Sequence, residues 1–143
     1  MLSNQNHPDD PIPVVIQELP PELAEQLRNL HESFTPMLLR MIQEHGMTEV
    51  ECYKRAHINR RQFSRIRCDL YYHPRKTTVI ALAMAMHLDL EETQALMKAA
   101  GYWLSNSLAS DVVVMFAIRC GNYDLFELNH TLITCNQKPL VLD

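Results

Sequence analysis

Residues 48–67 read TEVECYKRAHINRRQFSRIR and contain two helix-start signals separated by a short interval. Thr48 is followed three residues later by Glu51, and Asn59 is followed at the same distance by Gln62. Both pairs have the spacing of a capping box, in which the side chains at the start of a helix bond to each other's backbone amides. The interval Ala56–Ile58 is too short for anything but a tight turn. The stretch therefore predicts two short helices packed at an angle, the second capped by Asn59.

The second of these helices carries a basic face. Phe63 and Ile66 take the inward positions of a helical repeat. That phase turns six polar side chains outward: Arg60, Arg61, Gln62, Ser64, Arg65 and Arg67. Arginine pairs with guanine O6 and N7, glutamine pairs with adenine N6 and N7, and further cations neutralise phosphates. The free amides at the start of the helix offer one more phosphate site. We therefore expect this face to bind nucleic acid.

Similar signals predict helices on both sides of this pair. A short helix is expected after Pro21, and a longer one is expected between Thr35-Pro36, with Thr35 as its cap, and Gly46. Further helices are expected over residues 76–87, between 89 and 101, over 109–120 and over 123–134. All three glycines follow directly after one of these helices, where a positive φ is wanted. No stretch alternates apolar and polar residues for long enough to form a strand, so the sequence predicts an all-α fold.

Residues 36–96 resemble the repressor/Cro-type (XRE-like) helix-turn-helix domain, a five-helix fold. The resemblance runs through MLLRMIQEHGMTEVECYKRAHINRRQFSRIR, the proline in YYHPRKT, and TVIALAMAMHLDLEET. It implies a repressor-like domain over residues 34–101. The prolines near the start of the chain predict an arm at 1–33 with a possible short helix. Residues 102–143 lie outside the resemblance and are expected to form two additional helices. Those two helices either close the domain's own core or form a dimer face. We favour core closure and leave a homodimer open.

By position, the resemblance implies that Arg60, Arg61 and Gln62 read bases in the major groove of double-stranded DNA, with Ser64 nearby. We assign phosphate contacts to the neighbouring cations Lys54, Arg55, Arg65, Arg67 and Lys76. Neutralising about five phosphates predicts a log–log salt slope of about −4.5. A DNA-binding transcriptional regulator is the function that these residues imply.

Three positions depart from the family pattern and motivate an alternative. Glu49 stands where the family usually has a phosphate-clamping glutamine, Tyr53 replaces a small alanine, and His57 replaces the turn glycine. A carboxylate at the first of these positions repels phosphate. The alternative is a protein-interaction module that keeps the fold and binds an acidic partner, or whose basic helix is covered by the acidic arm. RNA binding is a third option.

Charge is distributed unevenly along the chain. The net charge is −4 overall, yet residues 34–76 carry nine bases and four acids. Within residues 54–67 there are six bases and no acid. This asymmetry is typical of a local surface that faces a polyanion on an otherwise acidic protein.

The sequence carries little that indicates a membrane protein, an exported protein or an enzyme. The longest apolar run, near residues 79–86, is far shorter than the ~20 residues of a membrane span, and no export leader opens the chain, so a cytoplasmic protein is expected. No phosphate loop, nucleophile elbow or metalloprotease motif is present, so we expect no enzyme activity and no cofactor.

The remaining candidates receive structural interpretations. The four cysteines are expected to be reduced and mostly buried. Cys52 with His57, and Cys68 with His73, share a spacing that is weak evidence for zinc, and core packing is favoured. Tyr71, Tyr72 and His73 are expected to pack in the turn before Pro74 and not to stack on a nucleotide.

Overall fold

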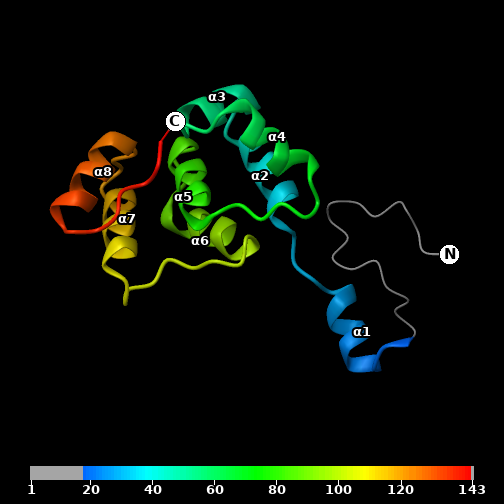
Figure 1. Ribbon diagram of the computed structural model, residues 1–143. Coiled ribbons are helices and arrows are strands. Elements are labelled where there is room, and N and C mark those ends of the chain that lie inside the picture. Colours follow the sequence, from blue (N-terminus) through cyan, green and yellow to red (C-terminus); the bar gives the residue numbers. More distant parts are fainter. Residues whose placement is uncertain (1–17, 143) are drawn as a thin grey trace.

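The computed structural model describes residues 18–142 of the 143-residue chain. Every regular element in that range is a helix, which confirms the all-α prediction. The helices follow one another in the order drawn in Figure 1: α1 Pro21–Arg28, α2 Phe34–Glu44, α3 Glu49–Arg55, α4 Arg60–Cys68, α5 Lys76–Ala85, α6 Leu90–Ala99, α7 Ala109–Arg119 and α8 Leu125–Thr134. Within the described range, none of these helices is long and apolar enough to cross a membrane.

Local capping explains where several helices begin. The capping box of Thr48 and Glu51 opens α3, with both hydrogen bonds at 3.0 Å. The same arrangement opens α6 at Asp89 and Glu92. These boxes confirm the predicted starts, because each satisfies two backbone donors that would otherwise lack partners.

The predicted cap at Thr35 is wrong. The helix α2 already begins at Phe34, and the residue before it, Ser33, occupies the cap position. The Thr35 hydroxyl instead donates a 2.9 Å hydrogen bond to the carbonyl oxygen of Ile66, near the end of α4. Thr35 thus ties α2 to α4, a tertiary role that its position beside Pro36 does not reveal.

Residues with positive φ close most of the helices. The three glycines have φ values between 68° and 86°, as predicted, and they follow α2, α6 and α7. His57, His87 and Asn136 adopt the same conformation at the ends of α3, α5 and α8. After α3, the amides of His57 and Ile58 donate back to Lys54 and Tyr53, which is the Schellman pattern.

The core is one continuous cluster of buried side chains that extends from Phe34 in α2 to Leu140 beyond α8. Helix α5 lies at its centre, and its residues from Thr78 to Ala85 are all buried. Figure 1 shows α7 and α8 on one side of α5, with α2, α3 and α4 on the other. Helix α1 stands apart from this bundle.

Three histidine–aromatic pairs join residues 34–101 to residues 102–143. The histidines lie at the ends of α3 and α5 and in the loop before α5, and their ring centroids are 4.6–5.4 Å from those of their partners: His57 with Phe126, His73 with Tyr102, and His87 with Tyr123. The two tyrosines also donate hydroxyl hydrogen bonds of 2.8 Å to the Pro74 and Leu88 carbonyl oxygens. The contacts orient α7 and α8 relative to α5.

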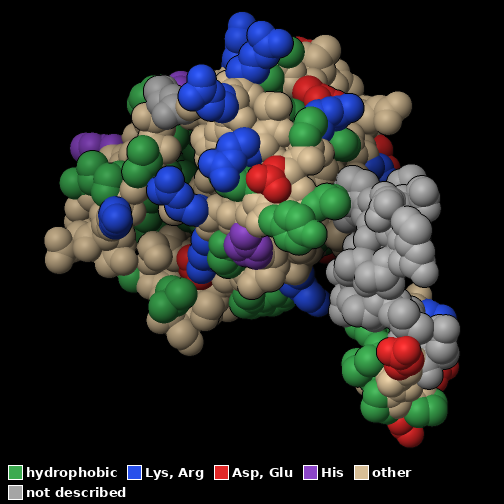
Figure 2. All heavy atoms as spheres, turned by 45° about the vertical axis from the view of Figure 1, so that its right-hand side comes forward, with side chains coloured by type: hydrophobic (Ala, Val, Ile, Leu, Met, Phe, Trp, Pro, Cys, Tyr) green, Lys and Arg blue, Asp and Glu red, His purple; other side chains and the backbone are tan. Residues whose placement is uncertain are grey.

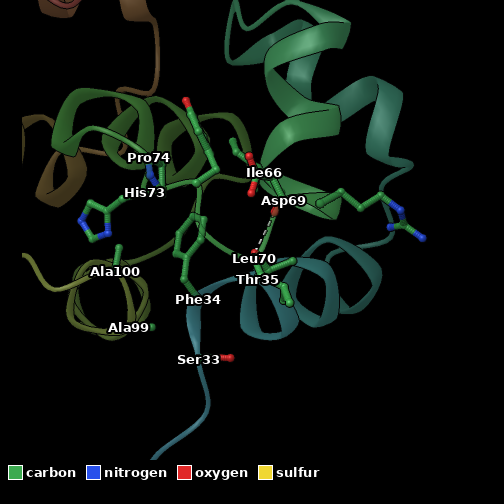
Figure 3. Close-up of a pocket in the computed structure, with 12 residues that line it drawn as sticks. Ser33, Phe34, Thr35, Ile66, Asp69, Leu70, His73, Pro74, Ala99 and Ala100 are labelled. Carbon is green, nitrogen blue, oxygen red and sulfur yellow. Dashed lines mark hydrogen bonds between the residues drawn. The ribbon is translucent and has the colours of Figure 1, made fainter. Parts of the chain in front are cut away.

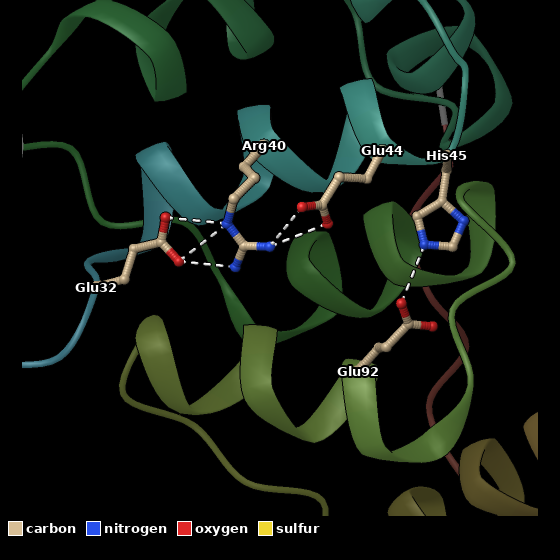
Figure 4. A network of polar contacts seen from close by, with 5 residues as sticks. All are labelled: Glu32, Arg40, Glu44, His45 and Glu92. Atoms are coloured by element: carbon tan, nitrogen blue, oxygen red, sulfur yellow. Dashed lines mark hydrogen bonds and ion pairs between the residues drawn. The ribbon is translucent and has the colours of Figure 1, made fainter.

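Polar contacts fix α2 against its neighbours, as shown in Figure 4. Arg40 bonds to Glu32 before the helix and to Glu44 one turn further on, at 2.7 Å and 3.0 Å. The Arg40 hydrogen bond holds the pKa of the Glu32 carboxyl below its ordinary value. His45, just beyond α2, contacts Glu92 of α6 at 3.1 Å. Of these pairs, only the His45–Glu92 contact joins α2 to another helix, and exposed pairs of this kind contribute little stability each.

Candidate nucleic-acid interface

The candidate interface is built on α3 and α4, which four residues connect. The Asn59 side chain caps α4 by accepting a 2.7 Å hydrogen bond from the Gln62 backbone amide, which is one of the two bonds of the predicted capping box. Tyr53 of α3 lies half-buried, with its ring centroid 5.3 Å from that of Phe63 in α4. The tyrosine therefore fills the space between the two helices where a small residue would leave a gap. Nearby Cys52 is fully buried, and burial raises the pKa of its thiol to about 12.

The outer face of α4 follows the predicted phase. Phe63 and Ile66 are buried beneath the helix. Five side chains lie on its exposed face: Arg60, Arg61, Ser64, Arg65 and Cys68. Arg67, near the end of the helix, is also exposed. These five residues are named the α4 face below.

Gln62 does not belong to this face, and the prediction that it points outward is wrong. Its side chain is half-buried, and its Nε2 donates a 3.3 Å hydrogen bond to the Thr78 hydroxyl of α5. Position 62 lies next to Phe63 on the side that turns toward α5. The Gln62 amide group therefore anchors α4 to α5, and it is not positioned to read a base.

Several of the predicted phosphate-binding cations are paired with carboxylates. Arg67 bonds to Glu49 of α3 at 2.6 Å, which joins the two helices of the pair. Arg55 lies 3.9 Å from Glu51, one turn earlier in α3. Because both pairs are substantially exposed, solvent and salt screen them. They nevertheless lower the positive charge of this surface.

Lys76 lies outside the interface. Its ammonium group is 2.7 Å from the Asp111 carboxylate of α7, and the side chains of these residues are 28% and 3% exposed. Asp111 also accepts a 2.9 Å hydrogen bond from the Ser105 amide. The Lys76 charge is thus committed to a largely buried ion pair, which does not favour the predicted phosphate contact.

Three of the cations assigned to this surface have no carboxylate partner within the described part of the chain. Among residues 18–142, neither Arg60 nor Arg61 nor Lys54 has a carboxylate oxygen within the 4.0 Å of an ion pair. The Arg65 guanidinium lies 4.4 Å from the centroid of the Tyr72 ring, a cation–π contact that leaves its hydrogen-bond donors available. Figure 2 shows lysine and arginine side chains spread over the upper part of the displayed face, with a few acidic side chains between them.

The loop after α4 differs from the predicted turn packing at one position. Tyr72 packs under Arg65, and His73 lies against Tyr102, as expected for turn residues. Tyr71, in contrast, is 92% exposed. The sequence offered no signal for this difference, because three consecutive aromatic-type residues cannot all face the core and their order does not show which one faces out.

A small cavity beneath this loop is lined by apolar residues and by a few polar ones, among them Arg67, Asp69 and His73. It measures about 170 Å³ and lies between the start of α2, the end of α4 and the end of α6. Figure 3 shows Phe34, Pro74 and Ala100 on its walls, with the Thr35–Ile66 hydrogen bond crossing one side. We regard it as a packing gap between three helices.

The structure also locates the metal candidates. Cys52 is buried, but Cys68, Cys120 and Cys135 are exposed, so the prediction of mostly buried thiols is wrong. Across residues 18–142 no three histidine, cysteine or acidic side chains come together in a way that would hold a metal ion. The two pairs also differ in setting, because Cys52 lies within α3 with His57 just after it, whereas Cys68 ends α4 and His73 lies in the following loop.

Comparisons with protein families, with characterised proteins and with solved structures found no match for this chain.

Proposed function

We propose that this protein is a DNA-binding regulator of the repressor-like helix-turn-helix class, with α4 placed in the major groove. The observation that carries the proposal is the exposed, unpaired pair of arginines, Arg60 and Arg61, in the first turn of a rigidly packed helix. The first turn of the second helix is where proteins of this class contact base edges. Arg65 and Lys54 would then bind phosphates on either side of the groove.

The structure changes the expected extent of the contact. Of the five cations assigned to phosphates, Arg55, Arg67 and Lys76 are paired with carboxylates, so two remain for phosphate contacts, Lys54 and Arg65. The Gln62 side chain is bonded to Thr78. Arginine can donate two hydrogen bonds to the O6 and N7 atoms of guanine. We therefore infer a target in which guanine contacts dominate and adenine contacts by Gln62 are missing.

A charge-reversal experiment tests this proposal. Arg60→Glu combined with Arg61→Glu is expected to weaken binding to random double-stranded DNA at low salt by more than about tenfold. The matched control is Lys98→Glu combined with Arg119→Glu, which changes the net charge equally at exposed positions on α6 and α7. Retained affinity in the α4 variant, or equal losses in both variants, would rule out a specific role for α4.

A second candidate, a protein-interaction module, is favoured by Glu49. Its carboxylate lies on the surface of the helix pair and neutralises Arg67 at 2.6 Å. A partner protein with an acidic surface would meet the same α4 arginines. If wild-type protein fails to bind DNA or RNA but retains an acidic protein partner that the Arg60→Glu/Arg61→Glu variant loses, this second function replaces the first.

A further inference from the structure

The loop that follows α4 presents Tyr71 to solvent in a defined position. The Tyr71 amide donates a 3.0 Å hydrogen bond to the Asp69 side chain, and the Tyr72 amide donates a 3.1 Å bond to the Asp69 carbonyl oxygen. Tyr72 in turn packs under Arg65 of α4. The loop is thus anchored on both sides of Tyr71, while the Tyr71 ring itself remains 92% exposed and contributes nothing to the core.

This exposed ring continues the surface of the α4 face. A shallow, open hollow of about 490 Å³ is lined by Ser64, Arg65 and Cys68 of that face and by Asp69, Leu70 and Tyr71 of the loop. Leu70 is also more than half exposed. The hollow therefore has one cation, Arg65, at its helix side, and its loop side is formed by Leu70, Tyr71 and the Asp69 carboxylate.

Such a combination of cationic and aromatic groups suits the bases of a nucleic acid. An aromatic side chain beside a basic groove binds bases by stacking, and the contact accepts any base because each has a π face. The Asp69 carboxylate on the loop side already accepts the Tyr71 amide, so part of its hydrogen-bonding capacity is used inside the loop.

We propose that Tyr71 stacks on an unpaired base of the nucleic acid that α4 binds, an inference that rests on the proposed function. In an intact duplex, neighbouring base pairs cover the faces of each base, so an aromatic ring has no face to contact. A bulge, a nick or a frayed end provides one. The ligand that this interface fits best is accordingly a duplex with an unpaired nucleotide next to the α4 site.

Binding to three fluorescein-labelled ligands tests the inference: an intact duplex, the same duplex with a single-nucleotide bulge, and the corresponding single strand. Wild-type protein is expected to prefer the bulged duplex over the intact one. Tyr71→Ala is expected to weaken binding to the bulged duplex by about 5- to 150-fold, the range that loss of one stacked base produces. Binding to the intact duplex should stay unchanged, because that ligand exposes no base face.

Two matched variants identify the kind of contact. Tyr71→Phe retains the ring and is expected to bind as wild type; if it loses as much affinity as Tyr71→Ala, the hydroxyl makes the contact and stacking is refuted. Trp103 is the single native tryptophan, so Tyr71→Trp in a Trp103→Phe background carries its only tryptophan at position 71. The fluorescence of that tryptophan is expected to fall when it stacks on the unpaired base of the bulged duplex.

Failure of this inference is distinguishable from failure of the proposed function. If wild type binds DNA and Tyr71→Ala binds each of the three ligands as tightly as wild type does, the stacking role is refuted and the α4 interface stands. If wild type binds none of the ligands, the proposed function is refuted and the stacking role with it.

Discussion

His57 occupies a position whose backbone conformation favours glycine. It has a φ of 56° at the end of α3, a conformation that costs most residues about 1–2 kcal/mol relative to glycine. Its ring packs edge-on against Phe126 of α8, with centroids 4.9 Å apart. The side chain thus compensates for part of the backbone cost by holding the C-terminal helices in place.

A pair of substitutions separates the backbone cost from the ring contact. His57→Gly is expected to have a free energy of unfolding about 1 kcal/mol larger than that of His57→Ala, because both lack the ring and only alanine is strained. Urea denaturation measures the difference. The same two substitutions at Lys54, an exposed helical position in α3, should give the opposite order by about 1 kcal/mol. Equal stabilities at position 57 would contradict the assigned strain.

The hydrogen-bond partners of individual residues were predictable only where the partner lies close in sequence. The caps at Thr48, Asn59 and Asp89 follow from groups within one helical turn. The Gln62–Thr78 bond joins residues 16 positions apart, and no local pattern indicates it. For that reason the sequence predicted the cap of α4 correctly and the direction of Gln62 wrongly.

At the scale of elements, the ion pair between Lys76 and Asp111 connects the start of α5 to the first turn of α7. These residues are 35 positions apart, so the lysine appeared in the sequence as part of a basic stretch. The boundaries predicted for α2 to α8, in contrast, lie within about two residues of those observed, because caps or glycines mark many of them. What the sequence did not reveal is which charges the packing of helices would pair.

Removing one member of this pair is expected to destabilise the fold. Lys76→Met leaves the Asp111 carboxylate buried with the Ser105 amide as its remaining donor, and the expected loss in the free energy of unfolding is about 3 kcal/mol. Lys76→Met combined with Asp111→Leu should lose less than the single variant, since no unpaired charge stays buried. Chemical denaturation provides both values, and a Lys76→Met variant with the free energy of unfolding of wild type would contradict the role assigned to the pair.

At the scale of the whole molecule, an acidic protein carries one basic surface on a closed helical bundle. The net charge is −4, yet the cations of residues 54–67 are confined to α3 and α4, on the side of α5 opposite α7 and α8. The C-terminal helices therefore leave the α4 face uncovered. Long-range repulsion from the acidic remainder makes binding of a polyanion depend on these few local contacts.

The salt dependence of DNA affinity tests the central claim, that unpaired cations of α3 and α4 bind a polyanion, most directly. With about two phosphates neutralised, by Lys54 and Arg65, wild type is expected to show a log–log slope of about −1.8. Lys54→Ala combined with Arg65→Ala should bring the slope close to zero, whereas Lys76→Met should leave it unchanged. A wild-type slope near zero, or an undiminished slope in the Lys54→Ala/Arg65→Ala variant, would contradict the account.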